Sequence, residues 1–314
     1  CSIGPDQMMK TVEILSRHCH VPISVLPNAG LPVSENGRTV FKFGPEPFAE
    51  VVKSFVTEYG VQVVGGCCGT TPEHIRRTAA AVRGVKPRSR VIDPGLYVSG
   101  PQRAVLLDGS KSLIRFGERL NIRGSKKVRD AVENDSGINH DALEEVIREQ
   151  IEDLGCEVVD VCMDSNTVDT VAVLQEVVHR QTYDFSGAMC LDSFQVDALE
   201  EAIKAYPGRP IVNSISMEEA SPGVLKIDAV LEATKAHAPI YVALCTGPTG
   251  PAATADEKEA LATQILEHAR DRHGVPPSRI FVDVNVFPIG SEPVEGMNFR
   301  SEEHTSELQS HHDL

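Results

Sequence analysis

The stretch EVVDVCMD, residues Glu157–Asp164, decides the fold class of this chain. It is an almost continuous apolar run that ends in polar residues, and GAMCLDSF (Gly187–Phe194) repeats the pattern after an amphipathic segment. Apolar strands separated by helices are typical of a parallel sheet buried on both faces. The two segments therefore predict an α/β fold.

The same alternation extends over residues 112–298, with helical patterns such as residues 139–155 and 256–274 between several strands. The expected strands are LIRFGERLN (113–121), EVVDVCMD (157–164), GAMCLDSF (187–194), PIVNSIS (210–216), PIYVALC (239–245) and RIFVDVNVF (279–287). Polar residues stand at the C-terminal ends of five of them: Asn121, Asp160, Asp192, Asn213 and Asp283. Active sites of (β/α)8 barrels lie at that end of the strands. We interpret the segment as a TIM-type barrel that lacks its last strands, with a doubly wound sheet as the alternative.

The N-terminal part, residues 1–84, has its own alternation of strands and helices. VPISVLPNAG (21–30) and VQVVGGCC (61–68) are expected to be buried strands, and residues 5–18, 45–60 and 71–82 have helical patterns. Thr71 is the expected N-cap of the third helix and Pro72 its first residue. Residues 85–111 are rich in Pro, Gly and basic residues and are expected to form a linker. The polar tail, residues 299–314, resembles a translated sequencing adapter and is expected to be artefactual.

The overall composition limits the classes of partner. The chain has 314 residues and a formal net charge of −15, which argues against general nucleic-acid or anionic-membrane binding. No apolar run reaches the roughly 20 residues that a membrane helix needs. The eight cysteines lack the density of a secreted disulfide scaffold, so we expect a reducing, cytoplasmic location.

Two adjacent cysteines, Cys67 and Cys68, lie between glycines in VVGGCCGTTPEHI. Adjacent cysteines are poorly placed to form a disulfide with each other but well placed to bind one metal ion. Zinc held by three protein thiolates keeps a fourth position open for a substrate. Cys1, which precedes an expected helix in a loop-like context, is the candidate third ligand.

The segments CSIGPDQM, VLPNAGLP and GGCCGTTPEHI resemble, in this order, the C-terminal portion of the homocysteine domain in the cobalamin-dependent methionine synthase family. The resemblance implies that residues 1–84 are part of a homocysteine-binding zinc barrel whose early strands are missing. It also implies that Cys1, Cys67 and Cys68 bind Zn²⁺.

The segments GERLNIRGS, VVDVCMD, CLDSF, IVNSIS and FVDVNVFP resemble the pterin-binding domain of methionine synthases, which is related to corrinoid methyltransferases and dihydropteroate synthases. A pterin ring presents adjacent N–H donors and acceptors, which carboxylates and carboxamides can pair with bidentately. The resemblance implies that methyltetrahydrofolate is bound, with Asn121 and Asp160 in catalytic roles. The expected folate-binding residues are Glu118, Asn121, Asp160, Asp192, Asn213, Asp283 and Asn285.

Together the two resemblances imply a methyltransferase of methionine biosynthesis. A methyl group would pass from methyltetrahydrofolate through cobalamin, carried on another domain, to zinc-bound homocysteine. Departures from the family pattern at CMDSNTVD and LCTGPTGPAAT leave the proton donor to the folate open. Two alternatives stay open: a pterin-dependent synthase of the dihydropteroate type, and a non-catalytic folate- or corrinoid-binding module with structural zinc.

Overall fold

The structure is a computed structural model that describes residues 3–93, 95–107, 113–134, 136–184 and 187–285. The chain divides into two compact units between Pro94 and Gly95. Cys1 and residues 286–314, which include the predicted tail, lie outside the described residues.

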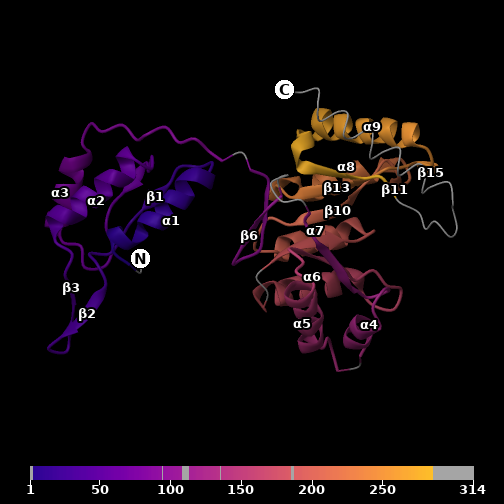
Figure 1. Ribbon diagram of the computed structural model, residues 1–314, viewed down its shortest axis with the longest axis horizontal. Coiled ribbons are helices and arrows are strands. Elements are labelled where there is room, and N and C mark those ends of the chain that lie inside the picture. The colour runs from indigo at the N-terminus through magenta and orange to yellow at the C-terminus, as the bar shows by residue number, and fades with distance from the viewer. Residues whose placement is uncertain (1–2, 94, 108–112, 135, 185–186, 286–314) are drawn as a thin grey trace. The chain divides into compact units, whose positions relative to one another are not determined.

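Over its described residues, 3–93, unit 1 has three helices and four short strands (Figure 1). In chain order these are α1 (Pro5–His18), β1 (Ser24–Val25), β2 (Pro32–Glu35), β3 (Arg38–Phe41), α2 (Pro45–Thr57), β4 (Val63–Val64) and α3 (Pro72–Val82). Strands β1 and β4 pair in parallel, while β2 and β3 form an antiparallel hairpin. The core between helices and strands contains Val12, Val25, Phe48, Phe55 and Val61.

The helices of unit 1 begin where the sequence indicates. Each has a proline in its first turn, where the missing N–H is not needed for an internal hydrogen bond. Thr71 is the N-cap of α3, as predicted, and its backbone N–H donates to Nδ1 of His74 at 3.1 Å. His74 Nε2 must then carry the proton, and it lies 2.8 Å from the carbonyl oxygen of Phe43.

The two strands predicted in unit 1 are shorter and less buried than expected. Only two residues of each segment pair, and Ser24 and Val63 are exposed. A two-stranded sheet with helices against it leaves its other face without a covering layer, so apolar strand residues such as Val63 stay at the surface. The local pattern identified the strands correctly, whereas their burial depends on neighbouring layers.

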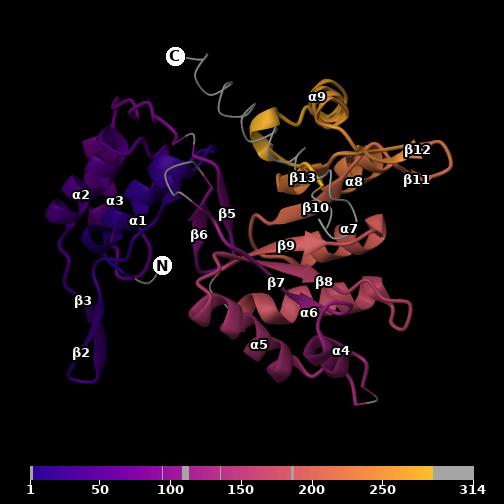
Figure 2. The same cartoon turned by 45° about the vertical axis from the view of Figure 1, so that its right-hand side comes forward.

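Unit 2 is built on a six-stranded parallel sheet with the order β16-β13-β10-β9-β8-β7 (Figures 1 and 2). Its strands are β7 (Phe116–Asn121), β8 (Val158–Cys162), β9 (Ala188–Asp192), β10 (Ile211–Ile215), β13 (Ile240–Leu244) and β16 (Ile280–Asp283). Each lies within one of the six predicted segments. The sequential order of neighbours is what repeated strand–helix–strand units produce.

The α-helices of unit 2 are α4 (Lys126–Val132), α5 (His140–Arg148), α6 (Thr170–Asp184), α7 (Val196–Ala205), α8 (Lys226–Thr234) and α9 (Ala255–His273). A π-helical turn, Glu149–Asp153, continues α5, and short 3-10 turns at Lys235–His237 and Pro277–Arg279 follow α8 and α9. Two further hairpins are β11 (Glu219–Ser221) with β12 (Val224–Leu225) and β14 (Thr246–Gly247) with β15 (Gly250–Pro251).

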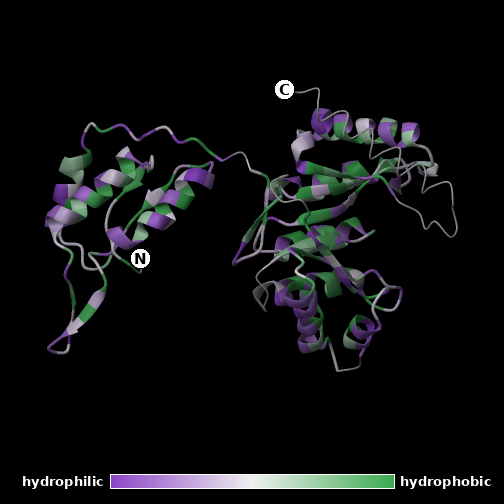
Figure 3. Ribbon diagram, in the orientation of Figure 1, coloured by the Kyte–Doolittle hydropathy of each residue, from purple (hydrophilic) through white to green (hydrophobic). Residues whose placement is uncertain are grey.

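The main core of unit 2 lies between the sheet and these helices. Strand residues such as Val161, Leu191 and Tyr241 pack against helix residues such as Leu199 and Ile265, all fully buried. The inner strands of the sheet are mostly apolar, whereas the helices show apolar and polar sides (Figure 3). This distribution is what a sheet covered by amphipathic helices requires.

Part of the segment expected to be a linker is instead an ordered hairpin. Strands β5 (Tyr97–Ser99) and β6 (Ala104–Leu106) pair antiparallel, and Val98 and Val105 pack on Val158 and Ile211 at the start of β8 and β10. Glycine and proline in this region mark the turns of the hairpin. The hairpin covers apolar side chains at the N-terminal ends of the parallel strands, opposite the predicted site.

The α/β class predicted from the sequence is confirmed by the six-stranded parallel sheet. Closure of either unit into a barrel stays a prediction. Within the part of the chain that the structure describes, every helix is too short or too polar to span a bilayer.

Candidate functional site

Three of the predicted polar residues come together at the C-terminal ends of adjacent strands. Asp192 ends β9 and is the register partner of Cys162 on β8 and of Asn213 on β10. Asp160, two residues before Cys162, hydrogen-bonds the Asn213 side chain. The parallel pairing of β8, β9 and β10 therefore gathers two carboxyl groups and one carboxamide in one place.

The Asp160 carboxyl group is held near its protonation midpoint at neutral pH. Its side chain is 8% exposed. Burial, followed by the nearby negative charge of Asp192, raises the pKa of Asp160 to about 7, although hydrogen bonds from Cys190 and Asn213 oppose the rise. An acid with this pKa can hold or release a proton at physiological pH.

Asp192 is in a similar environment, but the effects that raise its pKa and those that lower it are more nearly equal. Burial raises its pKa to about 6, and the negative charge of Asp164 acts in the same direction. A hydrogen bond from the Cys162 thiol and the positive charge of Lys226 oppose this rise. A buried acid and a half-buried acid so close together favour a state in which they do not both carry a full charge.

Lys226 supplies a buried positive charge that sequence reasoning missed. Its side chain is 7% exposed, its Nζ donates to Ser214 Oγ at 3.2 Å, and it lies 5.6 Å from the ring centroid of Phe194. Burial lowers the pKa of Lys226, partly offset by the charges of Glu218 and Asp192. Lys226 begins α8 after the β11–β12 hairpin, away from any strand end, so the strand-end pattern did not mark it.

Asp164 stabilises the loop that follows Asp192. Its two carboxylate oxygens accept hydrogen bonds from Ser193 Oγ and the Phe194 backbone N–H, both at 2.7 Å. The residue is buried and joins the loop after β8 to the loop after β9. These bonds fix the backbone that follows Asp192.

Two predicted residues lie on the edge strand β7. Asn121 Oδ1 accepts backbone hydrogen bonds from Arg123 and Gly124, both at 2.9 Å, which shapes the turn after the strand. Glu118 is exposed, and its negative charge raises the pKa of both Asp160 and Asp192. Glu118 therefore acts on the two aspartates through its charge, whereas the Asn121 side-chain oxygen binds the backbone of its own turn.

The two predicted residues at the end of β16 are placed differently. Asp283 is exposed, and its Oδ1 accepts the Asn285 backbone N–H at 2.8 Å. The Asn285 side chain donates to the Cys245 carbonyl oxygen at 3.0 Å and lies 3.1 Å from Thr246 Oγ1. β13 separates β16 from β10, so the structure brings these two residues to the same end of the sheet without direct contact with Asp160 or Asp192.

In unit 1, Cys67 and Cys68 lie in the turn between β4 and α3. The turn is held by Asn28, which is 4% exposed and whose Oδ1 accepts the Cys68 backbone N–H at 3.1 Å. The Cys67 N–H donates to the Pro27 carbonyl at 2.8 Å, and Thr70 Oγ1 donates to the Cys67 carbonyl at 2.6 Å. The PNAG loop after β1 thus orients the cysteine turn, a contact that VLPNAGLP alone did not reveal.

The spacing of the two sulfur atoms suits one metal ion. Their Sγ atoms are 3.9 Å apart. Two sulfurs that bind one tetrahedral zinc at 2.3 Å lie about 3.8 Å apart. Cys68 carries a free thiol, whereas Cys67 is disulfide-bonded, so this donor pair is available to a metal only after Cys67 is reduced. Cys1, the third predicted ligand, is outside the described residues.

An apolar cavity of ≈ 460 Å³ adjoins Cys67. Met8, Val12 and Leu15 of α1 line it, together with Val25. A thiol substrate with a short aliphatic chain could therefore approach Cys67 from an apolar side. Four further cysteines, Cys156, Cys162, Cys190 and Cys245, are buried in unit 2. Cys162 and Cys190 are more than inert packing, because each hydrogen-bonds one carboxyl group of the acidic cluster.

Comparison with protein families gives two matches. The pterin binding enzyme family matches residues 117–309, which is more than half of the chain. The homocysteine S-methyltransferase family matches residues 1–82.

Among curated proteins, the methionine synthase of Mycobacterium tuberculosis is 31% identical over 314 residues, covering 99% of this chain and 26% of that protein. The methionine synthase of Mycobacterium leprae is 30% identical over 296 residues, covering 93% of this chain and 24% of that protein. The chain thus spans about a quarter of the length of these relatives.

Solved structures give weaker similarities. Yersinia pestis DHPS with a pterine–sulfa conjugate has a TM-score of 0.46 at 16% identity, covering 68% of this chain and 73% of that one. Dihydropteroate synthase from Xanthomonas albilineans with 7,8-dihydropteroate has a TM-score of 0.47 at 14% identity, covering 68% and 75%. Similarities of this size do not establish a shared fold.

Proposed function

The chain belongs to the pterin binding enzyme family, and from that premise we propose that it is part of a methionine synthase. Unit 2 binds methyltetrahydrofolate, and unit 1 binds zinc and homocysteine. The complete protein transfers the methyl group between them through cobalamin held on a domain outside this chain. Both units belong to TIM-type barrels, and the location is the reducing cytoplasm.

The observation that carries the proposal is the cluster of Asp160, which is buried, with Asp192 and Asn213, which are half-buried. Carboxylate oxygens accept from the N–H donors of a pterin edge, and the Asn213 carboxamide can both donate and accept. Such groups at the bottom of a pocket recognise the ring and fix its orientation. Lys226 keeps the negative charge of the pocket balanced before the ligand enters.

Asp160 is the proposed proton donor or relay. Loss of a methyl group from a tertiary amine requires the leaving nitrogen to gain a proton. The pKa of Asp160, raised to about 7 by burial and by Asp192, lets its carboxyl group hold that proton near neutral pH. Asn121, whose oxygen is engaged in its own turn, would contribute its Nδ2 donor to the folate. Glu118, Asp283 and Asn285 would border the ligand.

In unit 1, the proposed zinc ligands are Cys1, Cys67 and Cys68. The 3.9 Å separation of the Cys67 and Cys68 sulfurs fits a shared ion. When bound, zinc would keep the thiol of homocysteine deprotonated and therefore nucleophilic at neutral pH. Asn28 and Thr70 orient the cysteine turn, and the apolar cavity beside Cys67 receives the aliphatic part of the substrate.

Calorimetric titration of the chain with methyltetrahydrofolate tests the folate part of the proposal. Asp192→Asn and Asn213→Ala should each weaken binding by at least about tenfold, since each removes a bidentate partner of the ring. Asp141→Asn, an exposed acid at the start of α5, is the matched control and should bind as the parent does. Equal affinity in all variants, or no binding by the folded chain, would refute the assignment. Dihydropteroate synthase activity would favour the alternative function.

A further inference from the structure

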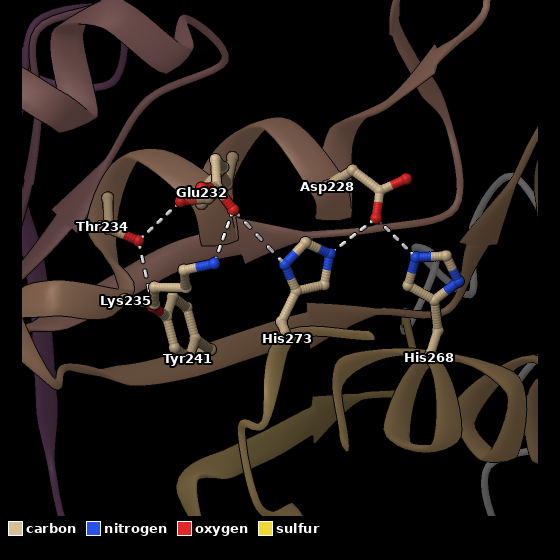
Figure 4. A network of polar contacts seen from close by, with 8 residues as sticks. Asp228, Glu232, Thr234, Lys235, Tyr241, His268 and His273 are labelled. Carbon is tan, nitrogen blue, oxygen red and sulfur yellow. Dashed lines mark hydrogen bonds and ion pairs between the residues drawn. The ribbon is translucent and has the colours of Figure 1, made fainter. Parts of the chain in front are cut away.

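A second group of potential metal ligands lies between helices α8 and α9, outside the acidic cluster. Asp228 is in the first turn of α8, while His268 and His273 lie in the C-terminal part of α9. Figure 4 shows both rings directed at one oxygen of Asp228. The Nε2 atoms of His268 and His273 lie 2.6 Å and 2.7 Å from Asp228 Oδ1.

The three ligand atoms converge on a single point. One nitrogen from each ring and one carboxylate oxygen all lie within 4.8 Å of one another. Ligands bound at about 2.1 Å to a tetrahedral ion lie roughly 3.4 Å apart, so outward shifts of under about 1 Å would admit an ion. The side chains of His268 and His273 are 12% and 9% exposed, and that of Asp228 is 30% exposed. The group is thus largely sheltered yet reachable by an ion from solvent.

The Nδ1 atom of His273, the ring nitrogen that does not contact Asp228, gives a second observation in favour of a metal ion. This nitrogen is buried and has no hydrogen-bond partner among the described residues. Glu232 Oε2, held by Lys235 Nζ at 2.6 Å, faces this nitrogen at 3.9 Å (Figure 4). If the neutral His273 ring carries its proton on Nε2 and donates it to Asp228, the lone pair of Nδ1 faces the Glu232 carboxylate, and the two repel each other. A metal ion on Nε2 would instead place the proton on Nδ1, directed at Glu232.

That arrangement matches the environment of metal-bound histidines in general. A ligating imidazole usually donates its second N–H to a carboxylate, which fixes its tautomer and orientation. Glu232 lies one helical turn after Asp228 on α8, so the same helix supplies a ligand and the outer carboxylate.

We propose that Asp228, His268 and His273 bind one divalent ion of the zinc class, which fastens α8 to α9. Two imidazoles and one carboxylate suit Zn²⁺, Co²⁺ or Ni²⁺ better than Mg²⁺ or Ca²⁺, which prefer oxygen ligands. Three protein ligands leave one position to water. The site is separate from the three proposed cysteine ligands and does not depend on the proposed function.

Zinc titration of the full chain carrying Cys67→Ser and Cys68→Ser tests the proposal, because this background removes two of the three proposed thiolate ligands. We expect one equivalent of Zn²⁺ to bind and the thermal unfolding midpoint to rise with zinc concentration. Asp228→Asn, His268→Gln and His273→Gln should each weaken binding by at least about tenfold. His237→Gln, an exposed histidine just after α8, is the control and should leave affinity unchanged.

Asp228→Asn guards against a folding artefact, because its amide oxygen can still accept from both histidines while the charge is lost. Co²⁺ substitution gives a second measurement: the absorption should show nitrogen and oxygen coordination with no sulfur charge-transfer band. The proposal is overturned if the folded serine background binds no zinc, or if all three ligand variants bind as tightly as that background. Histidine NMR signals that respond to pH but not to Zn²⁺ would likewise show a hydrogen-bonded cluster only.

Discussion

Cys190 and Asp160 are register partners on the adjacent parallel strands β9 and β8, and the thiol hydrogen-bonds the carboxyl group. Two residues further along, the pair is repeated in reverse, with Cys162 opposite Asp192. A side chain two positions later points to the same face of its strand, so both pairs serve one pocket.

Cys190→Ala should raise the pKa of Asp160 further above about 7, because the thiol hydrogen bond opposes the effects of burial and of Asp192. Carboxyl-carbon NMR titration of the labelled chain measures this pKa directly. Cys156→Ala, which removes a buried thiol elsewhere in unit 2, is the control. An unchanged or lowered pKa in Cys190→Ala would show that the thiol does not stabilise the carboxylate.

Folate binding should weaken as the pH falls below about 6. A pterin edge donates to the ionised carboxylate of Asp192, whereas in the ligand-free chain this group, with its pKa raised by burial, takes up a proton in this range. The affinity should therefore drop by up to about tenfold per pH unit for one linked proton. Calorimetry in buffers of different ionisation enthalpy counts the released protons. Affinity that is constant from pH 5 to pH 8 contradicts this linkage.

The ligand-free chain should lose stability as the pH rises from about 4 to about 7. In the folded state Asp160 stays protonated up to about 7, while in the unfolded chain it ionises near 3.8, so folding takes up a proton between these values. Asp160→Asn should reduce this dependence to the smaller part that Asp192 contributes, and should raise the free energy of unfolding at pH 8 by roughly 4 kcal/mol. Urea unfolding at pH 5 and pH 8 measures both effects, with Asp283→Asn as the exposed control.

Lys226→Met should raise the pKa of Asp192 above about 6, since the lysine charge lowers it and methionine keeps most of the packing volume. Folate affinity near pH 7 should fall, because a larger fraction of Asp192 is then protonated. NMR titration and calorimetry check the two effects separately. Lys204→Met, which removes an exposed lysine on α7, should alter neither.

Asn28→Ala should weaken zinc binding by about 10–100-fold without removing a ligand, because Asn28 orients the Cys68 backbone. Competition with a chelator measures the affinity of the reduced chain. Asn36→Gly is the control, since Asn36 lies in the β2–β3 turn with a positive φ of 51° that glycine adopts readily. Equal losses in both variants would point to general destabilisation of unit 1.

Zinc binding at the cysteine turn should require reduction. Cys67 is disulfide-bonded in this structure, and only a thiolate binds zinc. Zinc measured after gel filtration should be retained by the chain treated with reductant and absent from the oxidised chain. Cys19→Ser, which removes a free cysteine of unit 1, should not change the result. Full zinc retention by the oxidised chain would exclude Cys67 as a ligand.

The sequence by itself determined the strands of the parallel sheet and their order along the chain, but not the β5–β6 hairpin, which lies in the segment expected to be a linker. Continuous apolar runs predicted all six strands of the parallel sheet, and proline with Thr71 predicted where α3 begins. These features are local, since they depend on side chains a few residues apart. The polar strand ends also located the candidate site, because parallel strands bring their C-terminal ends to one edge.

Only the tertiary structure decided which groups share an environment. Residues that act together here are distant in the sequence. Lys226 lies beside Asp192, and Asn28 holds the turn at Cys68. Asp228 likewise contacts His268 and His273 from another helix. Burial, the distance between charges and the direction of a thiol or imidazole depend on how helices pack on the sheet. Those quantities set the pKa values and the ligand geometry, and no short segment of sequence contains them.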